Sequence, residues 1–300
     1  MNDIDLNRLR IFREVVALGS FSRAAEKLHQ PKSRVSRNVS ALESELGVQL
    51  IQRTTRQFRL TEEGLTLSSS LNSLLTDLDN ALVEVSSGVG EVTGRLRVTV
   101  PEDIGVELMG GICAEFLASH PKVYLNLHVG NQIMNLLKES IDIALRIGQG
   151  RDSSMIQKKI GIVRLELFAS PALIQKWGRS GKIEDLEAWP YLAFNPQDSL
   201  NHSVRLTSER QTRTLKLKSV FGSNNFFALR AMASLGMGFT QLPSFLGREP
   251  VEKGLLVPLF KNWSADPVPL MALIPHQKEI PLRTRRFIDF VSNRLVSVLK

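Results

Sequence analysis

The sequence predicts a chain of at least two domains: a mainly helical N-terminal winged helix-turn-helix, a long connecting helix and a C-terminal α/β region. The length of 300 residues exceeds the usual size of one domain. Charge also divides the chain, because residues 1–62 hold eleven basic and seven acidic side chains, whereas residues 63–92 hold five acidic and no basic ones. Short β-rich runs begin only beyond residue 94. We therefore expect borders that separate residues 1–62, 63–92 and 93–300.

The first 46 residues predict three helices. Apolar residues from Leu9 to Val16 mark one face of the first helix, which should end at Gly19. Ser20 and Ser22 offer capping hydroxyls for a short second helix at residues 23–28. In the third, residues 32–46, an inward stripe recurs at steps of four and three: Val35, Val39, Leu42 and Leu46. Three successive short helices with apolar faces that can pack together predict a helix-turn-helix.

The opposite face of the third helix is short, polar and basic. With one residue of the second helix, it predicts contacts to double-stranded DNA by Ser22, Lys32, Ser33, Arg34, Ser36, Arg37 and Ser40. Small hydroxyl residues let a helix lie deep in a major groove, and an arginine there bonds guanine or phosphate. A basic helix face alone is more often a solvated surface, so the prediction depends on the whole combination.

Two strand-like runs follow the third helix and predict a β-wing. They cover residues 49–53 and 57–60, and the tip between them carries Arg53, Thr54, Thr55 and Arg56. Such a tip suits contact with phosphate or the minor groove. Thr61, followed by Glu62 and Glu63, then predicts the capped start of the connecting helix.

The connecting helix carries apolar residues at alternating steps of four and three. These residues, predicted to form a dimer contact, are Leu71, Leu75, Leu78, Leu82 and Val85. The stripe needs an apolar partner, which a second copy of the helix would supply. The alternative is that the helix packs on its own C-terminal domain. Three glycines within residues 86–94 predict a hinge after it.

Beyond the hinge, strands alternate with helices and predict an α/β domain. We expect strands at 96–100, 123–129, 141–147, 165–169, 239–242 and 270–274. We expect helices at 105–119, 131–139, 224–234 and 282–299. Arg283, Arg285 and Arg286 are expected to form a surface cluster at the start of the last helix.

Composition narrows the classes of function. The net charge of +8 and pI near 9.8 favour an anionic partner. The N-terminus lacks a secretory signal and no apolar stretch is long enough to span a bilayer, so we expect a cytoplasmic protein without a membrane partner. The only cysteine, Cys113, excludes an internal disulfide and a cysteine-based zinc site, and we expect it to be a buried small hydrophobe.

Motifs for catalysis are missing from the sequence. There is no Gly-x-Ser-x-Gly elbow, no phosphate loop and no histidine pair at metal-ligand spacing. We therefore expect no enzyme, no cofactor and no metal, although an enzyme without a known motif stays open as an alternative.

Several motifs in the N-terminal region resemble one family. Phe21-Ser22-Arg23-Ala24-Ala25, Lys32–Arg37, Leu42–Gly47, Arg53–Arg56 and Leu60–Gly64 resemble, in order, the DNA-binding region of the LysR-type transcriptional regulators. The resemblance continues at 94–98, 142–148 and 235–239. It implies a winged helix-turn-helix, a dimer-forming linker helix and a two-lobed α/β effector domain like a periplasmic solute-binding protein. Pro31 departs from the family, which often has a capping serine there.

The resemblance also implies a site and partners. In an open α/β sheet, ligands bind beyond the carboxyl ends of the strands. By similarity, the effector-binding residues are Pro101, Glu102, Gly130, Asn131, Arg146, Phe194, Asn195, Arg205, Asn224 and Phe226, with the two arginines facing an anionic small molecule. We expect a homodimer or homotetramer on promoter DNA, with RNA polymerase as a further candidate partner. The alternative is an architectural DNA-binding repressor that responds to no effector.

Overall fold

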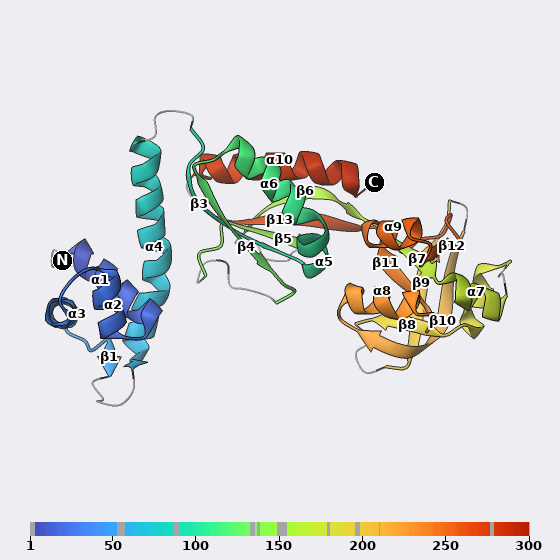
Figure 1. The fold of residues 1–300 in the computed structure, drawn as a ribbon, viewed down its shortest axis with the longest axis horizontal. Helices are drawn as coiled ribbons and strands as arrows, with labels where there is room; N and C mark the ends of the chain where they lie inside the picture. Colours follow the sequence, from blue (N-terminus) through green and yellow to red (C-terminus); the bar gives the residue numbers. More distant parts are fainter. Residues whose placement is uncertain are drawn as a thin grey trace. The chain divides into compact units, whose positions relative to one another are not determined.

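The computed structural model of the chain describes residues 4–52, 58–86, 91–132, 136, 139–148, 155–178, 181–195, 199–209, 211–276 and 279–299. It divides into two compact units, which Figure 1 colours along the sequence. The first unit contains residues 1–95 and 133–141, and the second contains residues 96–132 and 142–300. Each unit has its own core and is described by itself.

Three short helices begin the first unit. They are α1 (Leu6–Leu18), α2 (Phe21–Lys27) and α3 (Lys32–Leu46). Asp5 caps α1, and Gly19 ends it at φ +58°, a left-handed conformation that suits glycine. Ser20 caps α2 by accepting from the Arg23 amide at 3.4 Å. Pro31 stands at the N-cap of α3 and supplies no side-chain cap there.

Helix α4 (Glu62–Ser86) completes the core of this unit. Thr61 caps it, since its Oγ1 accepts from the Gly64 amide at 3.0 Å and donates to the Gln49 carbonyl at 2.7 Å. The core is built from buried residues of all four helices, among them Phe12, Val15, Val35, Leu42 and Leu71. The predicted inward stripe of α3 is therefore the side that packs, except that Leu46 is only partly buried.

The predicted wing is present as a short antiparallel pair. Strands β1 (Ile51–Gln52) and β2 (Arg59–Leu60) pair Ile51 with Leu60 and Gln52 with Arg59. Both are shorter than the sequence predicts. The wing tip, Arg53, Thr54, Thr55 and Arg56, lies outside the described residues.

The second unit begins with a five-stranded sheet in the order β4-β3-β5-β13-β6. Its strands are β3 (Gly94–Val100), which starts in the first unit, β4 (Val123–Val129), β5 (Ile143–Ile147), β6 (Met155–Val163) and β13 (Val268–Pro275). A continuous helical segment made of α5 (Glu102–Ile104), a π-helix (Gly105–Met109) and α6 (Gly110–Ser119) packs with α10 (Leu282–Val298). Phe116 and Phe287 join these helices, with ring centroids 5.0 Å apart. We call this part lobe 1.

A six-stranded sheet forms lobe 2, in the order β12-β7-β11-β8-β10-β9. Its strands are β7 (Leu165–Ala169), β8 (Tyr191–Phe194), β9 (Asn201–Thr207), β10 (Thr212–Ser223), β11 (Phe239–Pro243) and β12 (Val257–Leu259). Its helices are α7 (Pro171–Trp177), a 3-10 helix (Ile183–Ala188), α8 (Phe226–Ser234) and α9 (Ser244–Glu252). The chain passes between the lobes at Arg164 and again through residues 260–267.

Two sequence expectations differ from the structure. The described residues of the predicted helix 131–139 lie in bends and turns. The Asn131 side chain accepts from the Glu102 amide, the Gln132 carbonyl accepts from Arg146, and the Leu136 carbonyl accepts from the Ile141 amide. Arg283 is buried, at 4% exposure, whereas Arg285 and Arg286 are exposed. The prediction of a surface cluster is therefore wrong for Arg283, which α10 turns toward the lobe 1 core.

Candidate functional site

The outer face of α3 is a continuous exposed surface of polar and basic residues. The structure exposes Lys32, Ser33, Arg34, Ser36 and Arg37, and it exposes Ser22 on α2. Ser40 is half-buried. The inward stripe produces this arrangement, because burying Val35 and Val39 turns the intervening residues to solvent.

The two central arginines of this face, Arg34 and Arg37, make no ion pair among the described residues. Arg37 Nε donates to the Ser33 carbonyl at 3.3 Å, one turn back along α3. Among the described residues, no carboxylate pairs with the guanidinium of Arg34 or Arg37. Both groups can therefore turn to a base edge or a phosphate without first breaking an ion pair.

Glu43 fixes the wing to α3, a role that sequence reasoning missed. Its carboxylate is 9% exposed and accepts from the Leu50 amide at 2.9 Å and the Ile51 amide at 3.1 Å. A buried carboxylate that accepts two backbone amides makes strong hydrogen bonds. The start of β1 is thereby tied to the last turns of α3, so the exposed face and the wing share one frame.

The apolar stripe of α4 has two different environments. Leu71 and Leu75 are buried at 3% and 2% exposure, in the core of their own unit. Leu82 is 57% exposed, Leu78 is half-buried, and the side chain of Val85 lies outside the described residues. The first two leucines of the predicted dimer stripe are thus used within the chain. We call residues 78–85 the free half of the stripe, in which Leu82 is the stripe residue whose described side chain is exposed.

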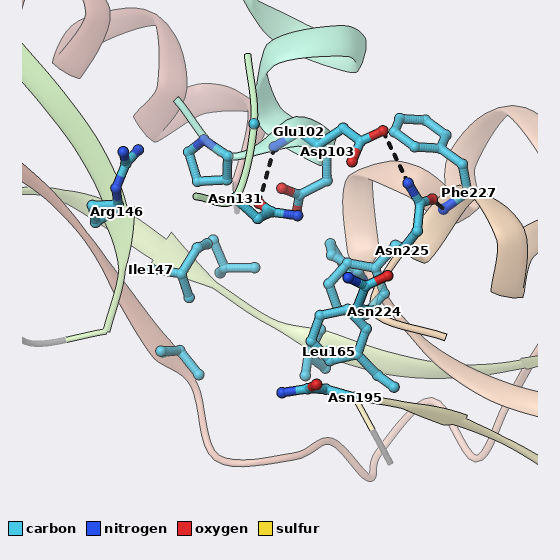
Figure 2. A pocket seen from close by; sticks show the side chains of 17 residues that line it. Glu102, Asp103, Asn131, Arg146, Ile147, Leu165, Asn195, Asn224, Asn225 and Phe227 are labelled. Carbon is cyan, nitrogen blue, oxygen red and sulfur yellow. Dashed lines mark hydrogen bonds between the residues drawn. The ribbon is translucent and has the colours of Figure 1, made fainter. Parts of the chain in front are cut away.

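A cavity of about 540 Å³ lies within the second unit and has walls from both lobes (Figure 2). Nine of the ten predicted effector-binding residues line it: Pro101, Glu102, Gly130, Asn131, Arg146, Phe194, Asn195, Asn224 and Phe226. The tenth, Arg205, lies on β9, is 65% exposed and faces Asp266, whose Oδ2 is 3.9 Å from its Nε. The ends of the strands bring the nine together, while Arg205 belongs to an outer strand.

Glu102 and Asn225 join the two lobes across one side of the cavity (Figure 2). Asn225 Nδ2 donates to Glu102 Oε1 at 2.9 Å, and the Glu102 amide donates to Asn131 Oδ1 at 3.3 Å. Asn225 also caps α8, because its Oδ1 accepts from the amides of Phe227 and Ala228 at 2.8 and 3.2 Å. One amide side chain therefore holds a helix and a carboxylate at the same time.

Arg146 is the only lysine or arginine among the described residues that line the cavity. Its guanidinium donates to the Leu145 carbonyl at 2.8 Å, to Thr99 Oγ1 at 3.2 Å and to the Gln132 carbonyl at 3.4 Å. Burial lowers its pKa from the usual value. The guanidinium is thus oriented by neutral oxygens and stands without a carboxylate partner among the described residues.

Several cavity residues were missed by sequence reasoning. The apolar ones are Ile147, Val163, Leu165, Phe227, Pro243 and Val268, and the polar ones are Asp103 and Asn225. Burial raises the pKa of the Asp103 carboxyl. Asp103, Asn225, Ile147 and Phe227 had a signal, since each adjoins a predicted residue. The other four had none, because four different strands of the two lobes supply them: Val163, Leu165, Pro243 and Val268.

These features define a class of protein. A helix-turn-helix with an exposed basic recognition face, linked to a two-lobed α/β domain with a cavity, has the architecture of transcription regulators. Residues 6–65 match the family of bacterial regulatory helix-turn-helix proteins, lysR family, and residues 90–296 match the LysR substrate binding domain. The chain belongs to the LysR family of DNA-binding transcription regulators.

Named relatives agree with this assignment along the full chain. The chain is 33% identical to the regulator CrgA of Neisseria meningitidis, over 96% of each chain. It is 31% identical to the regulator PtxR of Pseudomonas aeruginosa, over 98% of this chain and 94% of PtxR. The solved full-length virulence activator AphB of Vibrio cholerae is 30% identical and similar in structure at a TM-score of 0.60, over 96% of this chain and 99% of AphB.

Two features are absent from the described residues. No helix there has the length and apolar character that a membrane crossing requires. No set of three histidine, cysteine or acidic side chains gathers there in a metal-binding arrangement.

Proposed function

We propose that this regulator binds promoter DNA in the cytoplasm with the exposed face of α3, and that a small molecule in the cavity changes that binding. The observation that carries the DNA-binding part is the α3 face, whose exposed arginines have no acidic partner among the described residues. Arg34 and Arg37 would read base edges, and the serines would let the helix approach the groove. The wing residues 53–56 would contact the backbone.

Two copies would bind together through the free half of the α4 stripe. A dimer, or a pair of dimers, would place recognition helices in successive major grooves. Ligand binding between the lobes would shift the regulatory domains and change half-site spacing or DNA bending, and with it the contact to RNA polymerase. The cavity would bind its ligand without converting it.

Substitution of Arg37 tests the DNA-binding part. Genomic fragments retained by the purified protein supply an operator, and anisotropy titration then measures affinity. Arg37→Ala should weaken operator binding about ten- to hundredfold, since one specific arginine contact contributes about 1–3 kcal/mol. Arg285→Ala removes an equally exposed arginine from α10 and serves as the matched control. Equal affinities for Arg37→Ala and the unsubstituted chain would refute the assignment of α3.

The effector part is tested on the same operator. A compound that raises the melting temperature of the regulator should also change its operator affinity or footprint. If every stabilising compound leaves DNA binding unchanged, the effector-independent architectural protein is the better description.

A further inference from the structure

We propose that the cavity binds an amphoteric ligand, a small molecule with a carboxylate at one end, an ammonium group at the other and an apolar ring between them. The inference rests on the proposed function, because it names the chemistry of the molecule in the same cavity. It follows from the Arg146 guanidinium on one side of the cavity and the carboxyl groups of Glu102 and Asp103 on the other, with mostly apolar residues in the rest of the lining (Figure 2).

Arg146 defines the carboxylate end. The half-buried Arg146 guanidinium has lost part of its hydration without gaining a counter-ion, and a bound carboxylate would supply that counter-ion. The three neutral oxygens that hold the group fix its direction but leave its charge uncompensated. Arginine also matches the two oxygens of a carboxylate with parallel hydrogen bonds.

Glu102 defines the ammonium end. Figure 2 shows Glu102 with Asn225 on one side of the cavity and Arg146 on the other. Only Oε1 of Glu102 accepts a described hydrogen bond, from Asn225, so the carboxylate retains acceptor capacity for a ligand. Glu102 forms no ion pair among the described residues. A ligand with only negative charge would be repelled here.

Most of the remaining lining is apolar. Its side chains include Ile147, Val163 and Leu165 and the rings of Phe194 and Phe226. The amide of Asn131 lies between the two charged ends (Figure 2). Phe194 and Phe226 stack on each other at a centroid distance of 3.9 Å and an interplanar angle of 4°. A planar apolar body suits a lining that holds two parallel rings and several aliphatic side chains better than a hydrated chain does.

Three matched probes separate the two ends. 4-(Aminomethyl)benzoate carries both charges, 4-methylbenzoate only the carboxylate, and 4-methylbenzylamine only the ammonium group. Their biphenyl homologues repeat the set at a greater length. Binding to the full chain is measured by thermal unfolding and calorimetry, for the unsubstituted protein and for Arg146→Gln and Glu102→Gln. Arg205→Gln, outside the cavity, is the control.

At one of the two lengths, the two-charge probe should bind at least about tenfold more tightly than either single-charge probe of the same length. Arg146→Gln should reduce its affinity to that of the amine, Glu102→Gln should reduce it to that of the acid, and Arg205→Gln should change nothing. Arg146→Lys should keep part of the preference, which shows that charge and not shape is measured.

Two outcomes would overturn the inference. One is an acid that binds as tightly as the two-charge probe at both lengths, and the other is a set of probes that all fail to bind. Neither outcome affects the result of the DNA titration with Arg37→Ala. If a single-charge acid altered operator binding, the proposed function would stand and this inference would be wrong.

Discussion

At the scale of single residues, Cys113 shows how packing sets chemistry. It lies in α6 at 9% exposure, and burial raises the pKa of its thiol to about 11. Burial disfavours the charged thiolate, which is the reactive form. The sequence indicated a buried thiol, and the fold supplies the reason: α6 packs against β4 of the lobe 1 sheet and against α10.

Alkylation measures this effect directly. At pH 8, a thiol with a pKa of about 11 should react with iodoacetamide roughly a hundredfold more slowly than the thiol of the unfolded chain, whose pKa is near 9. The same chain in concentrated urea is the reference. Equal rates in the two conditions would mean that the thiol is accessible and ionises freely.

At the scale of elements, α4 shows one helix with two environments along a single stripe. The periodicity of its leucines is regular, yet Leu71 and Leu75 pack against the other helices of the first unit and Leu82 does not. Gly64 lies at the start of this packing. A Cβ added there would be 2.0 Å from the Leu50 carbonyl oxygen, which is backbone and cannot rotate away.

Gly64→Ala should therefore destabilise the first unit by about 3 kcal/mol, the upper range for overpacked sites. Urea unfolding followed by far-UV circular dichroism, together with operator binding, measures the loss. Gly111→Ala is the matched helical control, because a Cβ there meets no atom within 4 Å. It should be neutral or stabilising by about 0.5–1 kcal/mol. Similar curves for the two variants would show that the Leu50 carbonyl moves without cost.

At the scale of the whole molecule, the free half of the α4 stripe is the proposed contact between two copies of the chain. Leu82, which is on the stripe, is 57% exposed in the single chain, and Leu74, which is beside the stripe, is 61% exposed. Exposed leucines that continue a heptad pattern favour a second copy as their partner. The dimer stays a proposal, and it now depends on the later residues of the stripe.

Leu82→Glu should raise the dimer dissociation constant at least about tenfold, since each copy would lose a leucine that the dimer buries and would bring a charge into the contact. Sedimentation velocity across a concentration series measures it. Leu200→Glu, at a residue 63% exposed in lobe 2, controls for adding a charge at an exposed leucine. An unchanged dissociation constant would locate the dimer contact elsewhere.

The sequence by itself determined the local elements and the kind of protein. Helix periodicity located α3 and its two faces, and strand ends together with the family resemblance selected nine residues that line one cavity. Periodicity and strand ends depend on neighbours in the chain, which a single sequence contains. Only the tertiary structure showed that Arg205 lies outside the cavity, that Arg283 is buried and that Glu102 accepts a hydrogen bond from Asn225. Those outcomes depend on which strand or helix lies opposite, and contacts between residues more than a hundred positions apart leave no periodic signal in one sequence. The same holds for α4. The periodicity of its stripe predicted an apolar partner, but only the packing of the first unit decided which half of the stripe is covered within the chain.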